Sequence, residues 1–73
     1  MPRKKMTPRE IDAFRALLKL KKPMPHYEEI ADMVWGERTY HARQKVQRAL
    51  EGLERKGYIK TIIHDVTREI IVL

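Results

Sequence analysis

The longest periodic segment of this chain, from about Thr39 to Lys56, constrains the fold most. At about 100° per residue its apolar side chains fall on one stripe, which predicts an amphipathic helix that Gly57 ends. A chain this short buries only about 60% of the surface that its unfolded form exposes. It also contains no cysteine to cross-link a small core. The other segments must therefore cover this stripe, which consists of Ala42, Val46, Ala49, Leu50 and Leu53.

Two shorter helices are expected before this one. Thr7 supplies a hydroxyl N-cap, Pro8 a first helical residue and Glu10 the partner of a capping box, which together start a first helix. Pro23 and Pro25 are expected to end it. Its apolar face is predicted to consist of Ile11, Phe14, Leu17 and Leu18.

The second helix is short and acidic. Tyr27, Ile30, Ala31 and Val34 repeat the helical spacing, and Gly36 can end the helix in a left-handed conformation. Carboxylates near its start, including Glu28 and Glu29, are favoured by the positive end of the helix dipole. These acids need no functional explanation.

After the long helix, Tyr58–Ile63 and Arg68–Leu73 are rich in Ile, Val, Thr and Tyr, which predicts an antiparallel hairpin. The link His64–Thr67 lacks an Asn-Gly or Asp-Gly pair, so a loop of about four residues is expected. The predicted fold is mainly α with a small β-hairpin, a three-helix winged helix-turn-helix over residues 7–73. Residues 1–6 are expected to form a flexible basic arm.

The net charge of +6 is unevenly distributed. Residues 1–22 carry +6, residues 23–37 carry −4, residues 38–60 carry +5 and residues 61–73 carry −1. This excess favours an anionic partner, although solvation of a small domain explains part of it. The second basic block coincides with the long helix, and an α-helix fits the major groove of DNA. The pattern therefore predicts double-stranded DNA as the partner, with helix 39–56 in the groove and the hairpin beside it.

Individual residues are assigned by chemistry and position. Amide and guanidinium groups near the start of the long helix can pair with base edges, and other cations suit phosphates. The candidates for base reading are Thr39, Tyr40, His41, Gln44 and Arg48. The candidates for phosphate or wing contacts are Arg38, Arg43, Lys45, Lys60, His64 and Arg68.

Each assignment has a structural alternative. Gln44 and Arg48 could instead belong to a solvated helix face, and Tyr40 could close the core. Arg43 could lay its stem over apolar surface, and Arg68 could pair with Asp65 or Glu69 across the hairpin. Trp35, Tyr27, Tyr58 and Phe14 are expected to serve in packing.

Several segments, in this order, resemble the N-terminal DNA-binding domain of LexA-type repressors over about residues 7–73. They are Thr7-Pro8-Arg9-Glu10, Phe14, Met24-Pro25, Glu29-Ile30-Ala31, Leu50, Leu53 to Ile59 and Arg68 to Leu73. The resemblance implies a winged helix that binds operators. Between Ala31 and Leu50 this chain is about four residues longer than that family. Base contacts therefore do not transfer residue by residue.

The function expected from these observations is that of a sequence-specific transcriptional regulator, a LexA-like repressor. It is expected to act as a homodimer, and one alternative is that the homodimer forms only on DNA. A LexA-type repressor would continue past Leu73 into a self-cleaving, dimerising domain, whereas these residues offer no such chemistry. No enzymatic activity, cofactor, metal, membrane or small-molecule ligand is expected, and the location expected is the cytoplasm. The alternative is a protein-interaction adaptor in a transcription or replication complex, docking through the acidic second helix.

Overall fold

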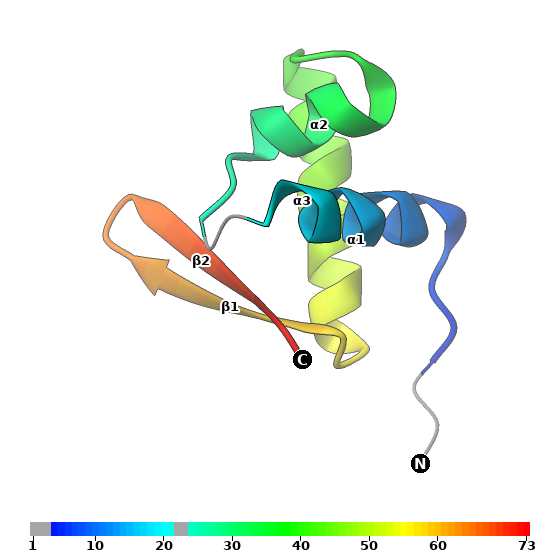
Figure 1. Cartoon of the computed structure of the whole chain (residues 1–73), viewed down its shortest axis with the longest axis vertical. Coiled ribbons are helices and arrows are strands. Elements are labelled where there is room, and N and C mark those ends of the chain that lie inside the picture. The colour runs from blue at the N-terminus through cyan, green and yellow to red at the C-terminus, as the bar shows by residue number, and fades with distance from the viewer. Residues whose placement is uncertain (1–3, 22–23) are drawn as a thin grey trace.

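The computed structural model describes residues 4–21 and 24–73 as three helices followed by a hairpin (Figure 1). The helices are α1 (Pro8–Leu20), α2 (Tyr27–Trp35) and α3 (Tyr40–Arg55). The strands β1 (Ile59–His64) and β2 (Thr67–Val72) form a two-stranded antiparallel sheet. α3 packs against α1, α2 and β1, so it is the central element of the domain. The predicted winged helix-turn-helix arrangement is confirmed.

Local capping fixes where the helices begin and end. The Thr7 hydroxyl accepts from the Glu10 backbone N–H at 3.3 Å, and the Glu10 carboxylate accepts from the Thr7 N–H at 2.8 Å. The Thr39 hydroxyl caps α3 by accepting from the Ala42 N–H at 3.2 Å. Gly36 ends α2 with φ +69°, a conformation that glycine adopts without a steric penalty. The predicted starts of α1 and α3 and the predicted end of α2 are confirmed.

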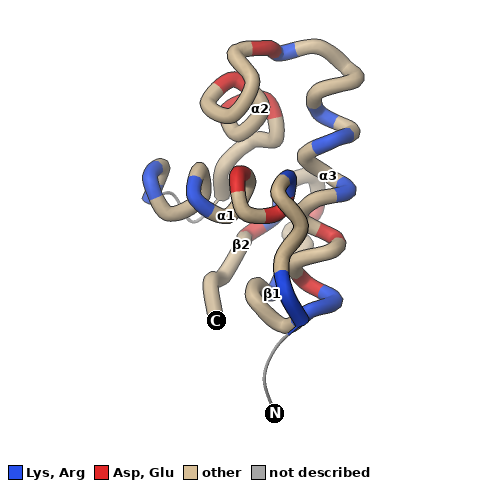
Figure 2. The backbone as a smooth tube through the Cα atoms, turned by 90° about the vertical axis from the view of Figure 1, so that its right-hand side faces the viewer, with Lys and Arg blue, Asp and Glu red and all other residues tan. Residues whose placement is uncertain are grey.

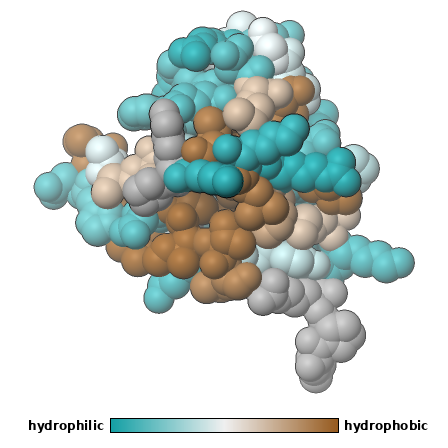
Figure 3. All heavy atoms as spheres, in the orientation of Figure 1, coloured by the Kyte–Doolittle hydropathy of each residue, from teal (hydrophilic) through white to brown (hydrophobic). Residues whose placement is uncertain are grey.

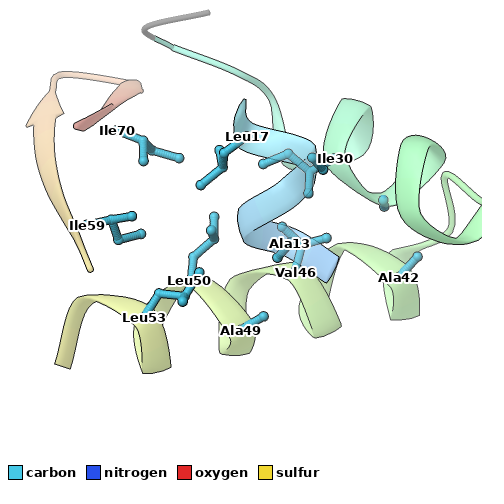
Figure 4. Packing of buried hydrophobic residues seen from close by; sticks show 12 residues of the cluster. Ala13, Leu17, Ile30, Ala42, Val46, Ala49, Leu50, Leu53, Ile59 and Ile70 are labelled. Carbon is cyan, nitrogen blue, oxygen red and sulfur yellow. The ribbon is translucent and has the colours of Figure 1, made fainter. Parts of the chain in front are cut away.

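The core lies where the three helices and the hairpin meet (Figure 4). Leu17 and Ile30 from the first two helices point toward the buried stripe of α3. Ile59 and Ile70 close the core from the sheet, and they are 1% and 7% exposed. The expected stripe of α3 is buried throughout, at Ala42, Val46, Ala49, Leu50 and Leu53. Phe14, Tyr27, Trp35 and Tyr58 pack around its margin as expected.

The apolar face predicted for α1 is partly wrong. Leu18 is 49% exposed and Ile11 and Phe14 are only half-buried, whereas Ala13 and Ala16 are buried. The reason is close helix packing: Glu10, on the same side of α1 as Ala13, meets Gly52 of α3, where an added Cβ would collide with the Glu10 carboxylate. Apolar spacing shows which side of a helix is hydrophobic, but a close approach selects the side with small residues.

Glu10 is the one buried charged residue in the part of the chain that the structure describes. Its carboxylate accepts a hydrogen bond from Lys56 Nζ, which joins the start of α1 to the end of α3. Burial raises the pKa of Glu10, but the hydrogen bonds from Lys56 and from the Thr7 N–H together outweigh burial. The pKa of Glu10 therefore lies below its ordinary value.

The hairpin pairs in register from Ile59 with Val72 to His64 with Thr67, which leaves only Asp65 and Val66 in the turn. The predicted four-residue loop is therefore wrong. Asp65 takes the left-handed conformation with φ +49°, which Asp tolerates better than most residues. The Thr67 hydroxyl also donates to the His64 carbonyl at 3.0 Å, so the turn is closed without glycine.

The first helix ends at Leu20, where Lys21 caps it with φ +52°, so α1 ends before either predicted proline. Pro23 lies outside the described residues, as do residues 1–3 of the expected arm. The carbonyl of Lys4 accepts from the Tyr58 hydroxyl at 2.8 Å, and the carbonyl of Lys5 accepts from Lys56 Nζ at 3.0 Å. The flexibility expected of residues 1–6 stays a prediction. In residues 4–21 and 24–73 no helix combines the length and apolar character needed to cross a bilayer.

Candidate nucleic-acid interface

The surface of α3 opposite its buried stripe is open to solvent. Tyr40 is 71% exposed, which excludes the alternative that it closes the core. Its hydroxyl accepts from Gln44 Nε2 at 3.0 Å, so the half-buried Gln44 amide has a fixed direction. His41 and Arg48 are exposed, and neither makes a hydrogen bond or ion pair with the described residues. Thr39 is also exposed, but its hydroxyl is used in capping.

Three of the predicted phosphate-binding cations, Arg38, Arg43 and Lys45, lie around the first half of α3 and contact α2. Two of them form ion pairs. Arg38 pairs with Asp32 at 3.3 Å, and Arg43 pairs with Glu28 at 3.5 Å. The Arg43 guanidinium therefore meets a carboxylate, whereas the placement of its stem over apolar surface stays a prediction. These side chains are about half exposed, and exposed pairs contribute only about 0–1 kcal/mol. A phosphate can therefore replace the carboxylate as the partner of either guanidinium.

Lys45 lies on the other side of α3, with its ammonium 5.6 Å from the centre of the Trp35 ring. A cation over an aromatic face is held in position without losing its charge. Trp35 thus packs on the core margin and also positions Lys45 beside the exposed face of α3.

The wing residues have contacts that the sequence did not indicate. Arg68 donates to the Tyr27 hydroxyl at 2.6 Å and lies 5.4 Å from the centre of the Tyr27 ring. Neither Asp65 nor Glu69 is its partner, which differs from the alternative of cross-strand pairing. His64 lies 3.0 Å from Glu69 instead. Lys60 is exposed and makes no ion pair with the described residues.

These contacts bring α2, α3 and the wing around one open hollow of about 550 Å³. Arg43 and Arg68 line it from opposite sides, which brings two predicted cations together. Gln47 also lines this hollow, although no role was predicted for that residue from the sequence. Helical spacing could have indicated Gln47, because it lies three residues after Gln44 and four after Arg43. Val66, which belongs to the predicted loop His64–Thr67, is 97% exposed at the wing turn and also lines the hollow.

Charge changes along α3. Figure 2 shows the basic positions of α3 near its start and near its end, with acidic positions between them. Glu51 accepts from Gln47 Nε2 at 3.2 Å, and Glu54 accepts from the Thr61 backbone N–H at 3.0 Å. The segment free of carboxylates therefore runs from the start of α3 to Leu50, and its last cation is Arg48. An anionic surface would meet this half of the helix first.

Together these features define a small winged helix-turn-helix domain with an uncovered polar face on its third helix. Comparisons with protein-family models, curated proteins and solved structures give no match to this chain. Among the described residues, no three His, Asp or Glu side chains group as metal ligands would.

Proposed function

We propose that this chain is a sequence-specific DNA-binding transcriptional regulator that inserts the first half of α3 into the major groove. The observation that carries the proposal is the outward direction of Gln44 and Arg48. Both lie opposite the buried stripe of α3, where Arg48 is exposed and the half-buried Gln44 is hydrogen-bonded to Tyr40. A groove-binding helix needs such a face, since it must reach base edges without unfolding.

Gln44 and Arg48 are the proposed base readers. An amide can donate to and accept from adenine, and a guanidinium can bind guanine through two hydrogen bonds. The Tyr40 hydroxyl holds one Gln44 N–H and leaves the other N–H and the amide oxygen for a base. Thr39 and His41 lie at the entry to the groove, where base or backbone contacts are available.

Cations around this face are proposed to bind phosphates. Arg38, Arg43 and Lys45 border the start of α3, while Lys60, His64 and Arg68 belong to the wing. Such contacts position a protein on the duplex and carry little sequence information. The Val66 turn is placed to meet the neighbouring sugar-phosphate backbone or minor groove.

The biological role proposed is that of a LexA-like repressor in the cytoplasm. A single helix in a single groove buries limited surface, so two copies on adjacent half-sites would gain affinity through effective concentration. The homodimer is therefore proposed to form on its operator.

Selection from a random duplex pool, followed by titrations at several salt concentrations, tests the proposal. Log K should fall with log salt at a slope of about −0.9 per phosphate neutralised. Gln44→Ala and Arg48→Ala should each relax preference at one base pair by about 1–3 kcal/mol. Lys45→Ala should weaken all duplexes alike and reduce the slope by about one.

Arg15→Ala is the matched control, because this exposed cation lies on α1, outside the proposed interface. It should leave both sequence preference and slope nearly unchanged. Absence of duplex binding in low salt would refute DNA binding and favour the protein-interaction adaptor, with the α2 carboxylates as its contact. An Arg48→Ala variant indistinguishable from the parent on every duplex would refute the placement of α3.

A further inference from the structure

The side of α1 next to the end of the hairpin carries a continuous apolar surface. It consists of Ile11, Phe14, Leu18, Tyr58 and Leu73, and we refer to these five residues as the α1 apolar surface. The Phe14 and Tyr58 rings meet edge to face with centres 6.1 Å apart. The Tyr58 carbonyl accepts from the Leu73 N–H at 3.0 Å, which brings the end of the chain beside these rings. Figure 3 shows the continuous hydrophobic area between α1 and the end of β2.

This surface exists because α1 has more apolar side chains than the domain covers. The helix buries Ala13 and Ala16, which leaves Leu18 49% exposed, and Leu73 at the end of the chain is 58% exposed. Single exposed apolar residues are ordinary, whereas a contiguous patch on a small domain indicates an interaction site. The proposed DNA interface does not use these residues, since it lies on the opposite side of α3.

The border of the α1 apolar surface is basic. Arg15 lies between Ile11 and Leu18 on the helix surface, four residues after one and three before the other. Lys21 follows Leu18 by three residues, and Lys4 is joined to Tyr58 by the hydrogen bond to its carbonyl. Among the described residues of α1, Asp12 is the exposed carboxylate. The cations at the border of the α1 apolar surface therefore outnumber the exposed carboxylates of this helix.

This border selects the chemistry of the occupant. In an isologous pair of α1 helices, Arg15 would lie near its own copy at the two-fold axis, and like charges there oppose association. A partner with acidic side chains around an apolar centre would instead gain from each of these cations. An amphipathic helix offers that arrangement in its simplest form.

We propose that the α1 apolar surface docks an acidic amphipathic helix of a partner protein. Large apolar side chains of that helix contact Phe14, Leu18 and Leu73, and its carboxylates meet Arg15 and Lys21. This interaction is independent of the proposed DNA binding, because it uses the other side of the domain.

The test uses the full chain labelled with ¹⁵N and a synthetic helical peptide of about 20 residues, long enough to form a helix in water. The peptide carries Leu and Phe on one face and Glu on the other. Adding it should shift the amide resonances of Leu18 and Leu73 and leave those of Gln44 and Arg48 in place. Leu18→Glu should weaken binding roughly tenfold or more, because it puts a charge at the centre of the contact.

Val66→Glu is the matched control, since it makes the same change at an exposed apolar residue of the wing turn. It should leave peptide affinity unchanged. Arg15→Glu should weaken binding without touching the core, and circular dichroism verifies that each variant is folded. A second peptide with Lys in place of Glu should bind at least about tenfold more weakly.

Equal binding of the two peptides, or no shift at Leu18, would refute the proposal. Two further outcomes would assign the surface to a different occupant. One is a dimer of this chain in sedimentation that Leu18→Glu dissociates. The other is binding to vesicles of anionic lipid that Leu18→Glu abolishes while the acidic peptide fails to bind.

Discussion

Glu10 connects the start of α1, the end of α3 and the segment before α1 through one carboxylate. It caps the Thr7 N–H and accepts from Lys56, whose ammonium also donates to the Lys5 carbonyl. The side chains of Glu10 and Lys56 are only 8% and 19% exposed, so water screens this pair less than the surface pairs. Loss of the charge should therefore matter more here than at Arg38 or Arg43.

Glu10→Gln should lower the free energy of unfolding by about 1–3 kcal/mol at pH 7, because Lys56 loses its ionised partner. Since the pKa of Glu10 is lowered in the folded state, its contribution is present above about pH 4.5. It is lost as pH falls through the lowered pKa. Thermal unfolding measured between pH 7 and pH 3 should show a smaller loss of stability in Glu10→Gln than in the parent. Parallel pH profiles for the two proteins would contradict this account.

Gly52 is required by the space beside Glu10. A Cβ at this position would collide with the Glu10 carboxylate, so Gly52→Ala must displace the Glu10–Lys56 ion pair or separate α1 from α3. A glycine in a helix interior ordinarily costs up to about 1 kcal/mol relative to alanine, but here we expect a net loss of about 1–3 kcal/mol. Denaturant unfolding measures it, with Glu51→Ala on the exposed side as control. A more stable Gly52→Ala variant would show that the Glu10 side chain or the helices can shift at no net cost.

At the scale of residues, contacts between residues close in the sequence could be predicted, whereas contacts between distant residues could not. The Thr7–Glu10 box and the Thr39 cap involve partners three residues apart, and both could be predicted from local rules. Arg68 was recognised as a wing residue, but its partner Tyr27 lies 41 residues away in another element. No periodicity indicates such a contact, because it depends on how the hairpin folds back toward α2.

At the scale of elements, periodicity predicted which helices form but not which side of α1 would be buried. The stripe of α3 has no competing apolar side, so its burial followed from spacing alone. α1 offers an alanine side and a Leu/Phe side, and it packs with Glu10 against Gly52, which buries the side that also carries Ala13. The hairpin was also predictable, whereas its turn depends on a single left-handed Asp65 that composition rules do not anticipate.

The wing is held toward α2 by the Arg68 contact with Tyr27, and this element should loosen when the hydroxyl is removed. Tyr27→Phe keeps the ring but removes the 2.6 Å hydrogen bond. Because the contact is exposed, we expect a loss of stability below about 1 kcal/mol. Hydrogen exchange should nevertheless quicken at amides of β2 that are bonded to β1, with the amides of α3 as an internal reference. Unchanged exchange in β2 would show that pairing with β1 alone fixes the wing.

At the scale of the molecule, function was predicted more coarsely than fold. The sequence indicated a basic third helix, and the structure leaves Gln44 and Arg48 on its open side. The hollow beside Gln47 emerged only from the relative placement of α2, α3 and the wing. A surface built from three elements can be predicted only when their tertiary arrangement is known. Net charge and the pattern of one helix are evident from the sequence alone.

The two proposed surfaces lie on opposite sides of a thin domain, which gives a prediction for the whole molecule. The Cα atoms extend 20 Å along the shortest axis, and α1 lies in front of α3 when the domain is viewed down that axis (Figure 1). This separation exceeds the Debye length of about 8 Å at physiological salt. An acidic peptide on α1 should therefore change the affinity of α3 for DNA by less than about twofold.

Fluorescence anisotropy of a labelled duplex, measured with and without saturating peptide, tests this independence. Leu18→Glu should likewise bind DNA as the parent does, because it changes charge only on the far side of the domain. Competition between peptide and duplex would mean that the peptide reaches the basic face of α3. In that case charge, and not the apolar surface on α1, would determine where acidic partners bind.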